Sequence, residues 1–324
     1  MNGNPRKILL DRILKNLPPH IKPANYLMDK LGLSKDSVYR RLKQEVSFSY
    51  EEAVILSEDL NFSLDYNDED DKETTINLNI RRLDSIPDTI DSLIREFEYI
   101  YKRMVQLSIS NNPEMFVTKN KVNILPVEYY EHLFRFFYYK WLHVLGAIPM
   151  YHPFSEITVP ENLLAYAKNQ ELLHSIDNVT FIVDTNEVQN TIKEIQYFYK
   201  QGLIEPSDIE LFKVELMENI TYEARRLSRK SPIERKHLKC YLSDINLNTN
   251  TMYSRDGNSE ESIFWIYSVI PHHTNNSHIC KHHREWLENF KRYSTLITGS
   301  GGIVLSRFIS EQEAYVKNMD KIMY

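Results

Sequence analysis

The sequence predicts a mainly α-helical protein. A module of four to five helices comes first, and a larger helical α+β domain with a small antiparallel sheet follows it. Apolar residues recur every three or four positions over most of the chain, which is typical of helices with one buried face. Glycine contributes only 8 of 324 residues, well below the roughly 7% of average proteins, so glycine-rich turns are scarce. Runs of β-branched and aromatic residues near the C-terminus, separated by turn residues, predict the antiparallel strands.

The N-terminal module, residues 1–66, is predicted to contain helices that open at Pro5, Pro23, Ser34 and Ser49. Proline suits the first position of a helix, and serine side chains cap exposed backbone N–H groups at helix starts. Each helix carries apolar side chains at helical spacing, so the four helices can share one small core.

The second and third helices are joined by a short turn that contains Gly32. A turn of three or four residues makes two helices cross steeply, which is the geometry of a helix-turn-helix unit. In such a unit the outer face of the second helix fits the major groove of DNA. Val38 and Leu42 are expected to face inward. The residues left outside or on the flanks are polar and mostly basic: Lys35, Ser37, Tyr39, Arg40 and Lys43.

Charge is unevenly distributed along the chain. The whole sequence carries a formal charge of −6, with 39 basic and 45 acidic residues. Between Lys22 and Lys43, by contrast, six basic residues accompany two acidic ones. A basic module on an acidic chain is typical of a local contact with nucleic acid.

The segments Leu27–Ser34, Val38–Leu42 and Val46–Asp65 together resemble the phage-repressor type of helix-turn-helix regulator, the family of Cro and lambda repressor. The resemblance covers residues 5–66 and implies a lambda-repressor-like DNA-binding domain. It implies DNA contacts from the start and outer face of the third helix: Ser34, Lys35, Ser37, Tyr39, Arg40 and Lys43.

Three further residues are expected to contact DNA phosphates: Lys22, Asn25 and Arg41. Two positions depart from the family pattern. Met28 stands where the family usually has alanine, and Arg41 stands where an apolar residue is common. We expect Arg41 to extend its guanidinium outward to a phosphate rather than fill the core.

An acidic linker is predicted at residues 67–76. The run Asp65–Glu73 contains six acidic residues and one lysine, and such a run is typical of a solvated connection. The alternative is that it mimics DNA phosphates and competes for the basic face of the module.

Residues 77–324 are predicted to form an α+β domain for dimerisation or sensing. Its helices are expected within 85–109, 126–145, 206–230 and 281–297, with a last one from Ser310. Its strands are expected at 179–184, 241–247, 249–256 and 262–270, the last three forming the small antiparallel meander. The aromatic residues of 126–145 suit core packing better than a ligand pocket.

Three segments of this domain carry candidate chemistry. His272–His283 contains five histidines and one cysteine and suits a polar loop, with zinc binding or pH sensing as alternatives. Residues 225–239 carry seven Lys or Arg, which suit a helix C-terminus, or else flanking DNA or an anionic effector. The glycine cluster Thr298–Gly302 matches no phosphate-binding pattern and suits a helix end and turn.

These observations exclude most enzyme classes. The sequence has no nucleophile elbow, zinc-protease, paired-cysteine or kinase signature, so we expect no catalytic residues, no metal and no cofactor. With two cysteines, no secretory signal and no apolar stretch that could span a membrane, we expect a cytoplasmic protein.

The sequence therefore predicts a non-enzymatic, sequence-specific transcription regulator. We expect it to bind double-stranded DNA at a two-fold operator as a homodimer and to respond to an unidentified small-molecule or protein effector. One alternative is a protein-interaction module, such as an antitoxin or adaptor, that uses a repressor-like fold. A second is an enzyme that the first module recruits to DNA.

Overall fold

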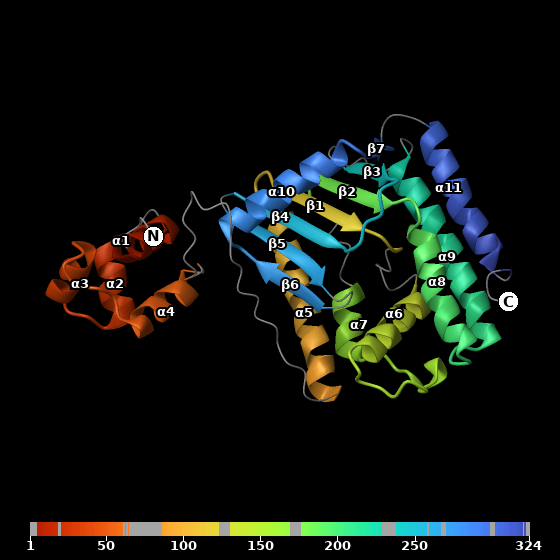
Figure 1. The fold of residues 1–324 in the computed structure, drawn as a ribbon, viewed down its shortest axis with the longest axis horizontal. Coiled ribbons are helices and arrows are strands. Elements are labelled where there is room, and N and C mark those ends of the chain that lie inside the picture. Colours follow the sequence, from red (N-terminus) through yellow and green to blue (C-terminus); the bar gives the residue numbers. More distant parts are fainter. Residues whose placement is uncertain are drawn as a thin grey trace. The chain divides into compact units, whose positions relative to one another are not determined.

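The computed structural model describes residues 5–18, 21–60, 62, 64, 86–122, 130–168, 176–228, 238–257, 259–266, 270–298, 302–319 and 321. These residues form two compact units, a small one built on the helices before residue 61 and a large one built on a β-sheet (Figure 1). The predicted acidic linker, residues 67–76, lies outside the described residues.

Within the described residues, the small unit contains four helices: α1 (Pro5–Asn16), α2 (Pro23–Leu31), α3 (Lys35–Leu42) and α4 (Tyr50–Asp59). Each contributes apolar side chains to one core, whose buried members are Ile13, Leu17, Leu27, Val38 and Leu56. The predicted serine cap at the start of α4 is confirmed and is part of a capping box, in which the Ser49 side chain accepts a hydrogen bond from the Glu52 N–H and the Glu52 side chain accepts one from the Ser49 N–H.

The large unit is built on one mixed sheet, which contains seven strands within the described residues. Its strands are β1 (Glu114–Lys119), β2 (Val179–Asp184), β3 (Lys239–Ser243), β4 (Thr251–Asp256), β5 (Ser259–Ile266), β6 (Ile270–Thr274) and β7 (Thr295–Leu296). The strand order is β6-β5-β4-β1-β2-β3-β7. The neighbouring strands β1, β2 and β3 are parallel, and the strands on either side of them pair antiparallel.

The predicted fold class is wrong about this sheet, which is large and mixed rather than small and antiparallel. Glu114–Lys119 was not expected to be a strand, yet it forms β1 at the centre and pairs with both β2 and β4. The first strand of the expected meander is β3, which lies beside β2 and is separated from β4 by two strands. Periodicity within a strand indicates which face is buried, but not which distant strand is its neighbour.

Helices cover both faces of the sheet and extend beyond one end of it. They are α5 (Ile86–Ser108), α6 (Glu131–Val144), α7 (Glu161–Lys168), α8 (Glu187–Lys200), α9 (Pro206–Leu227), α10 (Ser277–Lys291) and α11 (Gly302–Lys317), with a short 3₁₀ helix at Phe154–Glu156. The last helix starts at Gly302 instead of the predicted Ser310.

Three apolar cores hold this unit together. On one face of the sheet, α5, α9 and α11 pack against alternate strand residues such as Met115 and Phe181. On the other face, α10 packs Cys280 and Leu287 against Phe116 and its neighbours. Figure 1 shows α10 and α5 on opposite sides of the sheet.

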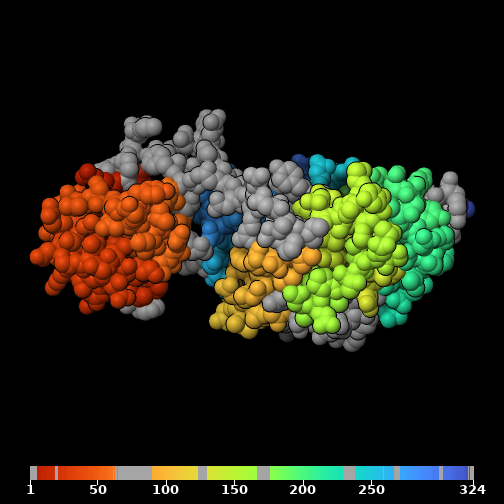
Figure 2. Space-filling view, turned by 90° about the horizontal axis from the view of Figure 1, so that it is seen from below, coloured from red at the N-terminus to blue at the C-terminus, as the bar shows by residue number. Residues whose placement is uncertain are grey.

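The third core lies among the helices beyond the sheet and is rich in aromatic rings. Phe136 of α6 makes edge contacts with Phe154, Phe198 and Phe212 from three other elements. The interpretation of the 126–145 aromatics as core residues is therefore confirmed for the described part, 130–145. At the rim of this core, α5 and α7 lie side by side on the surface (Figure 2).

Candidate nucleic-acid interface

The turn between α2 and α3 consists of Gly32, Leu33 and Ser34. Gly32 ends α2 with a left-handed backbone, φ +63°, a conformation in which an L side chain is strained. Ser34 then caps α3, and its hydroxyl oxygen accepts a hydrogen bond of 3.4 Å from the Ser37 N–H. The turn is short because glycine reverses the chain within one residue, and the cap starts the next helix almost at once.

Helix α3 has a buried side and an exposed side. Val38 is fully buried in the core of the small unit. The exposed residues of α3 and its two ends include five of the six predicted DNA contacts: Ser34, Lys35, Tyr39, Arg40 and Lys43. Ser37 is half-buried, and its hydroxyl lies 3.1 Å from that of Ser34. The structure therefore brings all six predicted residues together along one helix.

Two of the exposed cations have loose neighbours within the small unit. The Lys35 ammonium lies 5.9 Å from the centre of the Tyr39 ring. The Arg40 guanidinium is 3.9 Å from the Glu45 carboxylate, and both side chains are more than half exposed. A contact of this length in water contributes little and leaves the guanidinium able to bind another anion.

Arg41 occupies a different environment from the one the sequence suggested. Its guanidinium forms two hydrogen bonds, of 2.9 and 2.8 Å, with the carboxylate of Glu52 on α4. Both side chains are only 15% exposed. Arg41 thus connects α3 to the capping box of α4, and its guanidinium is directed to Glu52 instead of outward. The spacing of these residues gave no signal of this pair.

The start of α2 presents the other two predicted phosphate contacts. Lys22 and Asn25 are both exposed there. Nearby, Asp59 of α4 accepts hydrogen bonds from Lys30 and Tyr26. Those two bonds, that of Lys30 first, hold the pKa of Asp59 below its usual value, while burial and the Asp59 carboxylate raise the pKa of Tyr26. Lys30 therefore joins Arg41 among the cations that are paired inside the unit.

The large unit contains a second group of charges, which the sequence did not predict. Lys119, at the end of β1, lies 3.0 Å from Glu187 at the start of α8. Arg226 lies 2.6 Å from Glu223 within α9 and stacks on the Phe181 ring, 4.9 Å from its centre. All four side chains are nearly inaccessible to solvent.

Electrostatic interactions within this group are strong because water is excluded. Burial by itself lowers the pKa of Lys119, but Glu187 and Glu223 outweigh burial and raise it. Burial likewise raises the pKa of Glu223, but Arg226 and Lys119 outweigh it and the net pKa is lowered. Burial raises the pKa of the adjacent Cys240 thiol to about 12, so this thiol is not a nucleophile near neutral pH. The group suits a structural ion-pair network.

A third group shares one carboxylate between two lysines. Glu194 of α8 accepts a hydrogen bond of 2.8 Å from Lys140 and another from Lys121. Burial lowers the pKa of Lys140 to about 8, and Lys121 adds to this effect while Glu194 opposes it. Both lysines are committed to the same partner, which connects the end of β1 to α6 and α8.

The histidine-rich segment forms regular structure instead of the expected polar loop. His272 and His273 lie in β6, and the other three histidines lie in α10. His283 is buried between the hydroxyls of Ser262 and Thr251, at 2.9 and 3.0 Å, and burial lowers its pKa to about 4. His273 bonds the Glu96 carboxylate at 2.6 Å. Within the described residues, no three histidine, cysteine or acidic side chains are grouped as a metal would need.

The other two segments with candidate chemistry are only partly described. Within 225–239, residues 229–237 lie outside the described residues, as do residues 299–301 of the glycine cluster. Among the residues that are described, no helix has the length and apolar character needed to cross a membrane.

The chain was compared with protein-family models, curated proteins and solved structures. No family model, no curated protein and no solved structure matches it.

Proposed function

We propose that this protein is a sequence-specific DNA-binding transcription regulator, and that α3 is its recognition helix. The observation that carries this proposal is the division of α3 into a buried Val38 side and an exposed side with Lys35, Tyr39, Arg40 and Lys43. Lys30 and Arg41 contact carboxylates of α4. The exposed cations near the turn are therefore those of α3 and Lys22 at the start of α2, while α1 carries a separate exposed group: Arg6, Lys7 and Lys15.

The chemistry of this surface suits a DNA duplex. Arg40 can donate two hydrogen bonds to a guanine edge in the major groove, while Lys35 and Lys43 suit phosphates as point charges. Lys22 and Asn25 lie at the start of α2, the helix that would cross the DNA backbone. The backbone contacts would set the register of α3 in the groove, and the base contacts would supply specificity.

One recognition helix makes too few base contacts for strong discrimination. Helix α3 has eight residues and is therefore about 12 Å long, which covers only a few base pairs. We therefore propose that the protein acts as a homodimer on a two-fold operator and that the large unit supplies dimerisation or effector sensing.

A protein-interaction role is the second candidate. It is favoured by two exposed apolar side chains on α4, Tyr50 at 79% and Ile55 at 41% exposure, which would suit a protein partner better than a polyanion. An adaptor or antitoxin would use this surface without requiring DNA.

The decisive experiment is selection of binding sites from random duplexes by the purified full-length protein at 50 and 200 mM salt. Binding to the selected duplex is then measured by fluorescence anisotropy for the wild type, Arg40→Ala and Lys43→Ala. We expect Arg40→Ala to weaken the binding free energy for the selected duplex by about 1–3 kcal/mol and to relax the sequence preference of the protein. Lys43→Ala should weaken binding to all duplexes and reduce the slope of log affinity against log salt by about one.

Lys317→Ala in α11 is the matched control, since Lys317 is exposed on the large unit and pairs only with its helical neighbour Glu313. Its affinity for the selected duplex should equal that of the wild type. Failure to enrich any sequence, together with capture of a stable protein partner that Tyr50→Ser disrupts, would contradict the DNA-binding proposal and favour the second candidate.

A further inference from the structure

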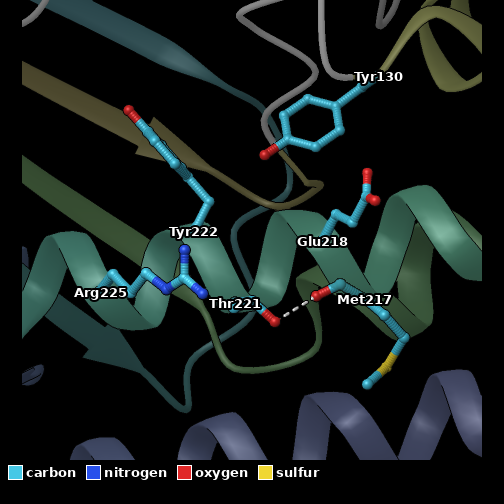
Figure 3. Close-up of a pocket in the computed structure, with 6 residues that line it drawn as sticks. All are labelled: Tyr130, Met217, Glu218, Thr221, Tyr222 and Arg225. Atoms are coloured by element: carbon cyan, nitrogen blue, oxygen red, sulfur yellow. Dashed lines mark hydrogen bonds between the residues drawn. The ribbon is translucent and has the colours of Figure 1, made fainter.

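A cavity of about 520 Å³ lies against the C-terminal half of α9. Its lining combines tyrosine rings, a thioether, a hydroxyl and two charged groups of opposite sign (Figure 3): Tyr130, Met217, Glu218, Thr221, Tyr222 and Arg225. Five of these residues lie on one face of α9, and Tyr130 comes from the residue before α6. Pockets that hold small ligands commonly have this size and this mixture of apolar walls and few polar groups.

The cavity adjoins the carboxyl ends of the parallel strands. Glu223 contributes to the raised pKa of Tyr130 and to that of Lys119, the last residue of β1, so the cavity wall and the end of β1 share one electrostatic environment. Strand β1 is also where the chain order in the sheet diverges, since β2 lies on one side of it and β4 on the other. Open α/β sheets commonly bind ligands outside the carboxyl ends of their parallel strands, which here are those of β1, β2 and β3.

The Tyr130 hydroxyl is held as a neutral donor. Burial, together with Glu223, Tyr222 and Glu218, raises its pKa and outweighs a hydrogen bond with the Asn219 side chain that lowers it, so the phenol keeps its proton at every physiological pH. Its position is determined by the start of α6, where the Glu215 carboxylate accepts hydrogen bonds of 2.9 and 2.6 Å from two backbone N–H groups. The Tyr130 ring therefore forms a fixed wall opposite α9.

Glu218 and Arg225 are the two charged groups of the lining. Within the described residues neither of them forms an ion pair with another side chain, although neighbouring charges in this unit are paired. They are separated by seven positions, which is two helical turns, so they lie on the same face of α9 about 10.5 Å apart along its axis. Side chains on a helix tilt in the same direction, which keeps the two charges apart.

This separation selects the length of a ligand. The ammonium and carboxylate of one amino acid are too close together to contact both groups. An extended chain of three residues spans about 10–11 Å and carries its two charges at opposite ends. Its side chains and backbone would lie along the Tyr130 and Tyr222 rings and Met217, which supply apolar contacts.

We propose that this cavity binds a short linear peptide of about three residues with free termini, its ammonium group at Glu218 and its carboxylate at Arg225. The Tyr130 hydroxyl would donate to a peptide carbonyl between them. This proposal does not depend on DNA binding, and it would supply a sensing role for the large unit whatever the small unit recognises.

The test is isothermal titration calorimetry of the full-length protein with a defined set of probes. The probes are tri-leucine with free termini, N-acetyl tri-leucine, tri-leucine amide and free leucine. We expect tri-leucine to bind and each blocked form to bind at least tenfold more weakly, while free leucine gives no measurable heat. Each blocked form lacks one charge-assisted contact, with Glu218 or with Arg225, and both of these side chains are exposed before a peptide binds.

Two variants assign each terminus to one residue. In Arg225→Gln the acid and amide forms of tri-leucine should bind equally weakly, and in Glu218→Gln the free and N-acetyl forms should do so. Arg292→Gln and Glu210→Gln are the matched controls, because both side chains are exposed outside the cavity. These two should bind tri-leucine as the wild type does.

The proposal is overturned if free and blocked tri-leucine bind with equal affinity, if none gives heat at millimolar concentration, or if the control variants lose binding as the cavity variants do. Tyr222→Ala offers a check independent of charge, since removal of the ring should lower the affinity for tri-leucine at least fivefold. None of these measurements involves DNA, so their failure and a failure to enrich an operator are distinguishable.

Discussion

Helix α3 of the small unit and the sheet of the large unit differ in the exposure of their cations. In the small unit, Lys35, Arg40 and Lys43 lie on the surface of one helix. In the large unit, Lys119 and Arg226 are almost completely buried and each contacts a carboxylate. The same residue types therefore stay exposed on α3, where we propose that they contact DNA, and form internal ion pairs at the sheet of the large unit.

The difference teaches that charge counted along a sequence does not locate a binding surface. Arg40 and Arg41 are adjacent in the chain, yet only Arg40 is exposed, because Arg41 points back to Glu52. Burial decides which role a cation has: an exposed ion pair contributes little energy, whereas a buried cation must be paired or it costs several kcal/mol.

The largest effect that we predict tests the buried side of this comparison. Lys119→Met should destabilise the large unit by about 3–5 kcal/mol, because it leaves Glu187 in a dry environment without its partner. Urea unfolding followed by tryptophan fluorescence measures this unit alone, since Trp141, Trp265 and Trp286 all belong to it.

Lys317→Met, on the exposed surface of α11, is the control and should change stability by less than about 0.5 kcal/mol. A double variant, Lys119→Met with Glu187→Leu, should regain part of the loss, since it removes both charges. Equal urea midpoints for Lys119→Met and the wild type would show that the buried pair is not structural.

The second prediction concerns pH and the buried His283. Its pKa is about 4 in the folded protein and about 6.5 when unfolded, so between these values the unfolded chain binds the extra proton. The neutral ring therefore contributes full stability above pH 6.5, and this contribution is lost as the pH falls through 4. The expected loss between pH 7 and pH 4 is about 3 kcal/mol.

The measurement compares urea midpoints of the wild type and His283→Gln at pH 7, 5.5 and 4. Glutamine can still bond the two neighbouring hydroxyls of Ser262 and Thr251 but does not titrate. We expect a smaller decline with acid for the variant, and parallel declines would refute a buried neutral imidazole.

The third prediction separates the two adjacent arginines. Arg41→Leu should lower the stability of the small unit by about 1–2 kcal/mol, because Glu52 loses two hydrogen bonds. Arg40→Ala should change that stability by less than about 0.5 kcal/mol, since its side chain is 63% exposed. Amide hydrogen exchange in α3 of the full-length protein gives both values. The comparison between buried and exposed cations fails if Arg40→Ala increases exchange as much as Arg41→Leu does.

The smallest effect is expected at the start of the proposed recognition helix. Ser34→Ala removes the side chain that caps α3. It should lower the stability of this helix by about 1 kcal/mol, as measured by the same amide hydrogen exchange. Ser47→Ala, an exposed serine outside any helix, is the control and should have no effect. Protection of the α3 amides that is identical in both variants would argue against the cap.

The sequence by itself determined the local structure of the small unit. The left-handed glycine at 32, the serine cap at 34 and the capping box at 49 and 52 are all as expected. Such signals are readable because each involves residues within three or four positions of one another, where chain geometry leaves few alternatives. The same holds for the long helices, whose apolar stripes repeat every turn.

Only the tertiary structure decided which distant segments became neighbours. The parallel pairing of β1, β2 and β3, the Arg41–Glu52 pair and the position of Tyr130 beside α9 join residues that no short pattern relates. Their pairing depends on how the whole chain closes around its cores and on which charges lose contact with water. Burial and strand order are properties of the packed molecule, and for that reason a mixed sheet replaced the small antiparallel one that local periodicity suggested.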